Sequence, residues 1–115
     1  MVDEDTGKIV AEKVMVAESF FSRFRGLMLR RRLGGDEALL FRFKKPGRHS
    51  VHMFFVRFPI DLVYLDLDSK VVEVRTWLKP WRLHLSKVDS KYLLEAPAGT
   101  VSRLNIRIGH KILET

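Results

Sequence analysis

The most apolar part of the chain is one stretch near its middle, residues 49–66, which reads HSVHMFFVRFPIDLVYLD. Pro59 divides this stretch, because a proline has no N–H to donate within a β-ladder. The two runs on either side of it, residues 49–56 and 60–66, look apolar on both faces. Such runs predict a pair of central strands rather than edge strands. The rest of the chain is expected to cover or extend this pair.

Shorter apolar runs predict further strands separated by turns. The segment 71–78 (VVEVRTWL) alternates well, with Val72, Val74 and Leu78 on one face, as in a strand half exposed to water. The other expected elements are strands at residues 8–16, 38–43, 92–96 and 111–113, a turn at 44–47 and a surface loop at 79–90.

One short helix is expected near the N-terminus, beginning at Ser19, which is a typical N-cap residue. Its apolar residues form one stripe that would pack against the sheet: Phe20, Phe21, Phe24, Leu27 and Met28. One more helical turn is expected at 100–104, and residues 1–7 are expected to form a frayed tail. The pattern therefore predicts a single domain over residues 1–115. Its class is α+β, mostly antiparallel β, with a small sheet curled toward a barrel.

Length and composition narrow the class of protein. A chain of 115 residues with 46% hydrophobic and 30% charged residues is typical of one globular domain. The chain has no cysteine, which excludes a disulfide framework, a thiolate metal site and a cysteine nucleophile. The acidic N-terminus does not resemble a secretory signal, and no apolar stretch approaches the ~18 residues of a membrane span. We therefore expect a cytoplasmic protein.

Positive charge is unevenly distributed along the chain. The formal net charge is +7, and ten lysines and arginines between Arg23 and Arg57 stand against only Asp36 and Glu37. This asymmetry suggests an anionic partner, such as nucleic acid, an acidic protein or a phosphate compound. The alternative is a basic face that only keeps the protein in solution.

Two tryptophans lie among cations further along the chain. Trp77 and Trp81 flank Lys79 and Pro80, and Trp77 is expected on the exposed face of its strand. Aromatic residues interleaved with cations stack on bases and hold backbone phosphates, but they serve protein partners equally well. We therefore predict a binding module rather than an enzyme, with nucleic acid or an acidic protein as its partner. The residues expected to form its surface are Arg30, Arg31, Arg32, Lys44, Lys45, Arg48, Trp77 and Trp81.

The alternative is an enzyme or a small-ligand pocket in the apolar interior. Two converging carboxylates at strand positions could perform acid–base chemistry. A carboxylate in an apolar strand is more often paired with a cation, however, and Arg25 or Arg57 could serve Asp61 in this way. The residues expected to line such a pocket are Met28, His52, Met53, Asp61 and Glu95.

The histidines do not form a recognisable metal motif. His49, His52 and Met53 are close in sequence, and imidazole with a thioether would suit copper. In a strand, however, His49 and Met53 share one face while His52 points to the other. No two-histidine spacing matches a standard site, so no metal or other cofactor is expected. No serine lies in a nucleophile elbow.

Four stretches of the chain, in their order and spacing, resemble a widespread family of prokaryotic proteins, number 192 in the domain-of-unknown-function series. They are Arg25-Gly26-Leu27-Met28, Ala38-Leu39-Leu40-Phe41, Met53 with Ile60-Asp61-Leu62-Val63-Tyr64-Leu65-Asp66, and Leu94-Glu95-Ala96-Pro97-Ala98-Gly99 with Ile108-Gly109. The likeness spans residues 9–113. His52 stands where the family usually has an aromatic residue, and His110 where it usually has an aspartate. The resemblance implies a compact β-rich domain and no particular reaction, because the family has no established activity.

Overall fold

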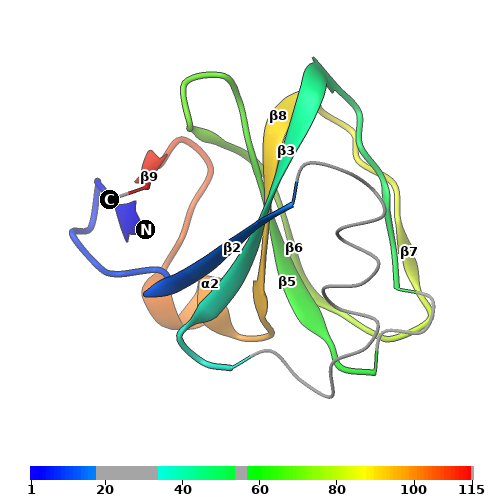
Figure 1. Ribbon diagram of the computed structural model, residues 1–115, viewed down its shortest axis with the longest axis horizontal. Helices are drawn as coiled ribbons and strands as arrows, with labels where there is room; N and C mark the ends of the chain where they lie inside the picture. The colour runs from blue at the N-terminus through cyan, green and yellow to red at the C-terminus, as the bar shows by residue number, and fades with distance from the viewer. Residues whose placement is uncertain (18–33, 54–56, 115) are drawn as a thin grey trace.

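The computed structural model describes residues 1–17, 34–53 and 57–114, with only the backbone of Ala17 and His52. Within these residues the chain forms nine strands and one short helix (Figure 1). The elements are β1 (Val2–Asp3), β2 (Lys13–Ala17), β3 (Glu37–Gly47), β4 (Val51–His52), β5 (Ile60–Leu65), β6 (Val71–Leu78), β7 (Leu83–His84), β8 (Ser90–Pro97), α2 (Thr100–Leu104) and β9 (Ile112–Leu113). The helix expected from Ser19 lies outside the described residues. The helix that is described, α2, confirms the predicted turn at 100–104.

Five strands form the main sheet in the order β2-β3-β8-β5-β6. β5 pairs antiparallel with β8 on one side and with β6 on the other. All six residues of β5 are buried, because neighbouring strands cover both of its edges and apolar layers cover both of its faces. The prediction of a central strand at residues 60–66 is confirmed.

The sheet separates two apolar layers. The first, which we call the Met53 layer, includes Leu39, Met53, Phe58, Leu62, Tyr64 and Leu93. The second, which we call the α2 layer, includes Leu40, Val63, Leu94, Val101, Leu104 and Ile112. Successive residues of a strand point to opposite faces, so β5 contributes to both layers.

The sheet does not close into the predicted barrel. β2 and β6 lie at opposite ends of the strand order, and they do not pair with each other in the described part of the chain. β2 also runs parallel to β3. Residues 18–36, which connect these two strands, are long enough for the crossover that a parallel pair requires. The fold is therefore mostly β, with an open sheet of mixed direction.

The first residues are held in place, which corrects the prediction of a frayed tail at 1–7. β1 pairs antiparallel with β9 at the other end of the chain, so the two ends of the described chain lie together (Figure 1). The Asp3 side chain is fully buried, and its Oδ2 lies 2.8 Å from Nδ1 of His110. The sequence did not indicate this pairing, because two-residue strands have no periodicity to detect.

Two predictions for the middle of the chain are also wrong. Residues 44–47, expected as a turn, continue β3, with an irregular register between Arg42 and Gly47. The run 49–56, expected beside β5, contributes only β4 to the described strands, and β4 pairs with β7 outside the main sheet. The predicted loop at 79–90 therefore contains a strand. The described residues contain no helix long and apolar enough to cross a membrane.

Candidate binding surface

Large apolar side chains are exposed along one segment that begins at the end of β6, residues 77–88, which we call the 77–88 ribbon. The exposed fraction is 57% for Trp77, 58% for Trp81 and 63% for Leu85, and Leu83 and Val88 are also exposed. One exposed apolar residue is ordinary, but several gathered on one surface mark an interaction site. The ribbon includes β7, which lies on the side of the molecule away from the two chain ends (Figure 1).

The first anchor of the ribbon is Asp61, a fully buried carboxylate on β5. Its Oδ1 accepts a hydrogen bond from the backbone N–H of Trp77, and its Oδ2 accepts one from the backbone N–H of Val101 in α2, both at 2.9 Å. Hydrogen bonds to an ionised carboxylate are stronger than those between neutral groups. Asp61 therefore ties the start of the ribbon to the helix through backbone amides. Of its two predicted partners, Arg57 makes no salt bridge with it in the described structure, and Arg25 lies outside the described residues.

The backbone at this anchor is bulged. Two residues of β6, Thr76 and Trp77, stand opposite Asp61, between the regular pairs Ile60↔Leu78 and Leu62↔Arg75. A bulge re-aims the side chain that it carries. Trp77 has a φ of 51°, which a bulky residue adopts only where its surroundings hold it. The bulge and Asp61 together direct the Trp77 indole outward.

The second anchor is the backbone of Met53, whose side chain is fully buried. The Met53 N–H donates to the carbonyl of Arg82, and the Trp81 N–H donates to the carbonyl of Met53, each at 2.8 Å. The pairing of β4 with β7 continues this connection. Trp81 has a φ of 66°, so both tryptophans are held in the left-handed region of the backbone.

The third anchor is Glu73 on β6. Its Oε1 accepts hydrogen bonds from the backbone N–H groups of Lys87 at 2.9 Å and Val88 at 3.1 Å, and from the Ser86 hydroxyl at 3.2 Å. Its Oε2 lies 2.7 Å from Nε2 of His84. Burial raises the pKa of Glu73, but the bonds from Lys87, His84 and Val88 together outweigh it and hold this pKa below its ordinary value of 4.5. The carboxylate therefore keeps its charge and fixes the second half of the ribbon.

The second half of the ribbon has two faces. His84 and Ser86 turn inward to Glu73, while Leu83, Leu85 and Lys87 are exposed. This alternation is that of an extended strand. The ribbon also carries three exposed cations, Lys79, Arg82 and Lys87, and no carboxylate. Its outer face is therefore both apolar and positively charged.

The predicted basic surface is not brought together with both tryptophans. Lys44, Lys45 and Arg48 are exposed near the end of β3, where Gly47 pairs with Ser90 at the start of β8. Trp77 lies near the other end of β8, where Pro97 pairs with Ile60. At about 3.3 Å per residue, the length of β8 places these ends about 20 Å apart. Arg30, Arg31 and Arg32 lie outside the described residues.

The alternative pocket is also divided by the fold. Glu95 pairs with Leu62 and Leu39 and so faces the Met53 layer, whereas Asp61 pairs with Ala96 and faces the α2 layer. The two carboxylates are fully buried on opposite faces of the sheet and cannot form an acid–base dyad. Met53 lies on the Glu95 side. Met28 and the side chain of His52 lie outside the described part of the structure.

Each of the three histidines with a described side chain is already engaged. His49 stacks on the ring of Phe43 with centroids 3.5 Å apart, His84 contacts Glu73, and His110 contacts Asp3. Among the described residues, no three histidine or carboxylate side chains gather into a group that could hold a metal ion.

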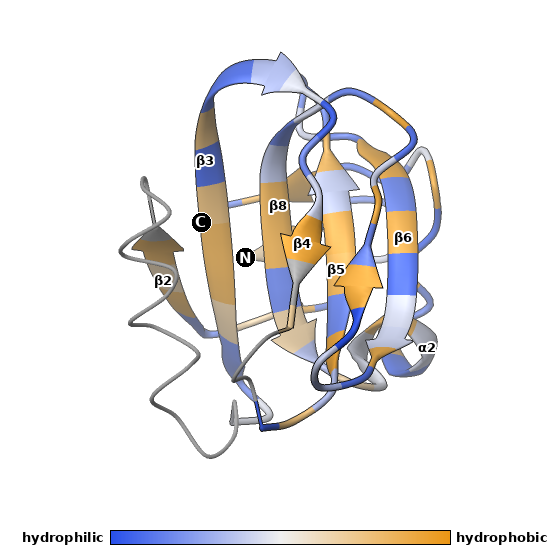
Figure 2. Ribbon diagram, turned by 90° about the vertical axis from the view of Figure 1, so that its right-hand side faces the viewer, coloured by the Kyte–Doolittle hydropathy of each residue, from blue (hydrophilic) through white to orange (hydrophobic). Residues whose placement is uncertain are grey.

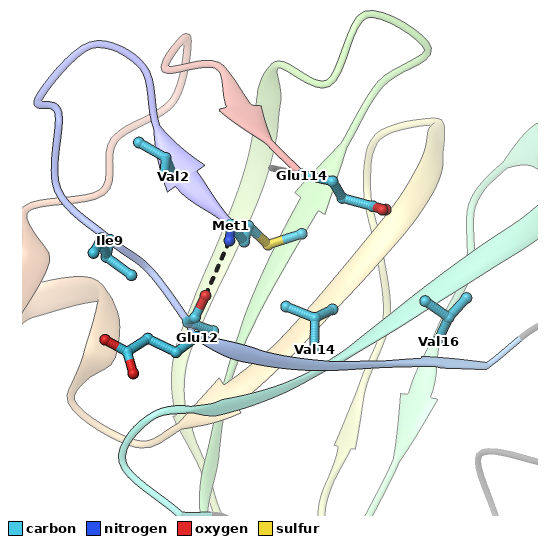
Figure 3. A pocket seen from close by; sticks show the side chains of 8 residues that line it. Met1, Val2, Ile9, Glu12, Val14, Val16 and Glu114 are labelled. Atoms are coloured by element: carbon cyan, nitrogen blue, oxygen red, sulfur yellow. Dashed lines mark hydrogen bonds between the residues drawn. The ribbon is translucent and has the colours of Figure 1, made fainter.

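A hollow that the sequence did not suggest lies beside β2, on the opposite side of the molecule from β7. Its volume is about 460 Å³, and Met1, Val2, Ile9, Ala11, Glu12, Val14, Val16 and Glu114 line it (Figure 3). Its walls are both polar and apolar, with the carboxylates of Glu12 and Glu114 beside apolar side chains. None of the residues predicted for a pocket contributes to it. Two of its lining side chains, Ile9 and Val16, are exposed apolar residues, with exposed fractions of 55% and 48%.

Comparison with known proteins identifies the family. The family model DUF192, described as "Uncharacterized ACR", matches residues 1–113. The chain belongs to the DUF192 family. A UPF0127 protein of Thermococcus sibiricus is 37% identical over 114 residues, which cover 97% of this chain and 72% of the relative. A UPF0127 protein of Pyrococcus furiosus is 34% identical, with 97% of this chain and 95% of the relative covered. The resemblance seen in the sequence is thus confirmed.

Two solved structures share the DUF192 fold seen here. A candidate transcription regulator from Sinorhizobium meliloti 1021 superposes with a TM-score of 0.80 at 28% identity, over 85% of this chain and 78% of that one. A protein of unknown function from Novosphingobium aromaticivorans superposes with a TM-score of 0.81 over 88% of this chain and 74% of that one. The second is 24% identical, so it supports the fold alone.

Proposed function

We propose that this DUF192 domain is a binding module rather than an enzyme, and that its 77–88 ribbon holds an acidic, apolar segment of a partner protein. The observation that carries this proposal is the exposure of Trp77, Trp81, Leu83, Leu85 and Val88 on a backbone fixed at three places. The lack of cysteine favours a reducing compartment such as the cytoplasm as its place of action.

The anchors matter because rigid surfaces bind at a lower entropic cost than mobile ones. A loop that only closed the chain could leave its backbone amides to water. Here buried Asp61 and half-buried Glu73 accept hydrogen bonds from those amides and hold the apolar side chains outward. Tryptophans on such a surface are the residues that most often dominate the free energy of binding.

The charge of the ribbon favours an acidic partner. Lys79, Arg82 and Lys87 lie among the apolar residues without a neighbouring carboxylate in residues 77–88, and complementary charge raises both specificity and association rate. Nucleic acid is the competing partner, since tryptophans between cations also stack on bases, and the Sinorhizobium meliloti protein is named as a candidate regulator of transcription. Leu83, Leu85 and Val88 favour protein, because aliphatic side chains offer bases no stacking face.

Partner class is tested by titrating the protein with four probes and following tryptophan fluorescence. The probes are short peptides of alternating Glu and Leu, of alternating Lys and Leu, and of alternating Glu and Ser, together with oligothymidylate. We expect the Glu–Leu peptide alone to bind with an affinity in the micromolar range and to shift the emission of Trp77 and Trp81. Binding of oligothymidylate without binding of the Glu–Leu peptide, and with a steep dependence on salt, would show that the partner is nucleic acid instead.

A further inference from the structure

The outer edge of β6 is open. β6 is the last strand of the main sheet, with β5 on one side and no strand on the other in the described part of the chain, and it is the outermost strand on the side away from β2 (Figure 2). At its first residue the edge is closed, since the N–H of Val71 donates to the carbonyl of His110 and the N–H of Gly109 donates to the carbonyl of Val71, both at 2.8 Å. For residues 72–76, the backbone bonds of the described structure are those with β5.

Open edges are usually protected, because unpaired N–H and C=O groups invite pairing with another chain. Bulges limit this edge at both ends, near Val71 and at Thr76–Trp77. Between them, Glu73, Val74 and Arg75 keep a regular register with β5. What remains is an unpaired edge about five residues long, which matches a short added strand.

The side chains along this edge select the kind of strand that could join it. Arg75 and Thr76 are exposed, and Trp77 follows them. The carboxylate of Glu73, the acidic residue of β6, is turned to His84 and the amides of residues 87 and 88. The edge therefore presents a positive charge and an indole. An extended segment with alternating acidic and apolar side chains complements both.

A second copy of this chain fits the edge less well. Two β6 strands paired antiparallel with Arg75 opposite Arg75 would place like charges directly opposite each other, which is destabilising. Pairing about Val74 would place Arg75 opposite Glu73, whose carboxylate is already bonded to His84 and to two backbone amides. We propose that residues 72–76 of β6 accept an extended acidic segment of a partner protein as an added strand. This inference rests on the proposed function for its class of partner, but its hydrogen bonds come from the backbone of residues 72–76, and of the 77–88 ribbon only Trp77 lies beside them.

Hydrogen exchange tests the inference, with a peptide of alternating Glu and Val as the probe. Its control is the same peptide with two adjacent central residues N-methylated, which removes one N–H from each of its edges. We expect the outward amides among residues 72–76 to exchange quickly in the protein alone and at least tenfold more slowly with the unmodified peptide. The N-methylated peptide should give no such protection.

Two variants with matched controls complete the test. Arg75→Glu should weaken peptide binding about tenfold, whereas Arg103→Glu, which changes an exposed arginine on α2, should not. Leu85→Ser, in the ribbon, should leave the protection of residues 72–76 in place. If the peptide binds without protecting these amides, or if the N-methylated peptide protects them equally, the strand-addition site is wrong while the ribbon proposal survives. Slow exchange of all these amides in the protein alone would also overturn it, because the edge would already be covered.

Discussion

β5 and the 77–88 ribbon are both rich in large apolar residues, yet the molecule treats them in opposite ways. Every residue of β5 is buried, whereas the ribbon exposes five of its large side chains. This difference in burial follows from the strands and apolar layers that surround each segment. β5 has a strand on each side and an apolar layer on each face, while among the described strands β7 pairs only with the two residues of β4. Hydrophobicity along a chain therefore marks candidates for burial, and the surrounding strands decide which are buried.

The two regions are joined by one buried and one half-buried carboxylate. Asp61 of β5 and Glu73 of β6 both accept hydrogen bonds from backbone amides of the ribbon. A buried charge is costly unless it is fully hydrogen-bonded, so these residues stabilise one particular path of the ribbon over others. The exposed apolar surface is a fixed feature of the fold.

The largest effect is expected from Asp61→Ala. Removing the carboxylate leaves the buried amide of Val101 and the partly buried amide of Trp77 without an acceptor, which should lower the free energy of unfolding by about 3–5 kcal/mol. Asp66→Ala is the matched control, since Oδ1 of Asp66 also accepts two backbone N–H bonds, but in an exposed turn. Asp66→Ala should lower the free energy of unfolding by about 1 kcal/mol. Equal losses in urea denaturation would show that Asp61 is not an anchor.

The next prediction compares a leucine of β5 with a leucine of the 77–88 ribbon by their contributions to the free energy of unfolding. Leu62→Ala in β5 should cost about 3 kcal/mol, because it opens a cavity in the Met53 layer. Leu85→Ala in the ribbon should cost less than about 0.5 kcal/mol, because its side chain is 63% exposed. Denaturation of both variants gives the measurement. A loss above about 2 kcal/mol for Leu85→Ala would mean that the ribbon packs inward in solution.

A smaller effect is expected from Glu73→Gln, which should lower the free energy of unfolding by about 1–2 kcal/mol. The amides of Lys87 and Val88 should also exchange their hydrogens faster. The pKa of Glu73 is lowered in the folded state from 4.5. Its charged form therefore stabilises the fold above pH 4.5, and this contribution is lost as the pH falls through the folded-state pKa. The stability gap between the wild type and Glu73→Gln should shrink below pH 4.5. Glu12→Gln, at an exposed glutamate, is the control and should change the free energy of unfolding by less than about 0.5 kcal/mol.

The sequence predicted the elements that have a clear local pattern. The segment 71–78 is β6, the run at 60–66 contains β5, and 100–104 is α2. The predicted shared face of Val72, Val74 and Leu78 is wrong, because Val74 packs against the α2 layer and the other two against the Met53 layer. Pairings between distant residues could not be predicted in this way. The strands β1, β4, β7 and β9 have two residues each, too few for a periodicity, and the parallel pairing of β2 with β3 depends on contacts rather than on pattern.

The candidate site was predicted in part. Trp77 and Trp81 were expected at a surface, and both are exposed. The alternation of Leu83 and Leu85 with His84 and Ser86 is a visible signal for the rest of the ribbon, although residues 79–90 are predicted as a surface loop. The partners of Asp61 could not be predicted, because backbone amides leave no mark in a sequence. The pairing register, which the sequence does not contain, separates Asp61 from Glu95.

The most direct test of the ribbon as a binding surface is the dissociation constant of the Glu–Leu peptide for Leu85→Ser and for Leu67→Ser. Leu67 is a matched control, because it is 65% exposed but lies outside the ribbon, in the turn between β5 and β6. We expect Leu85→Ser to weaken binding at least tenfold, about 1.4 kcal/mol, while Leu67→Ser binds like the wild type. Equal affinities for the two variants would contradict a role of the 77–88 ribbon in binding.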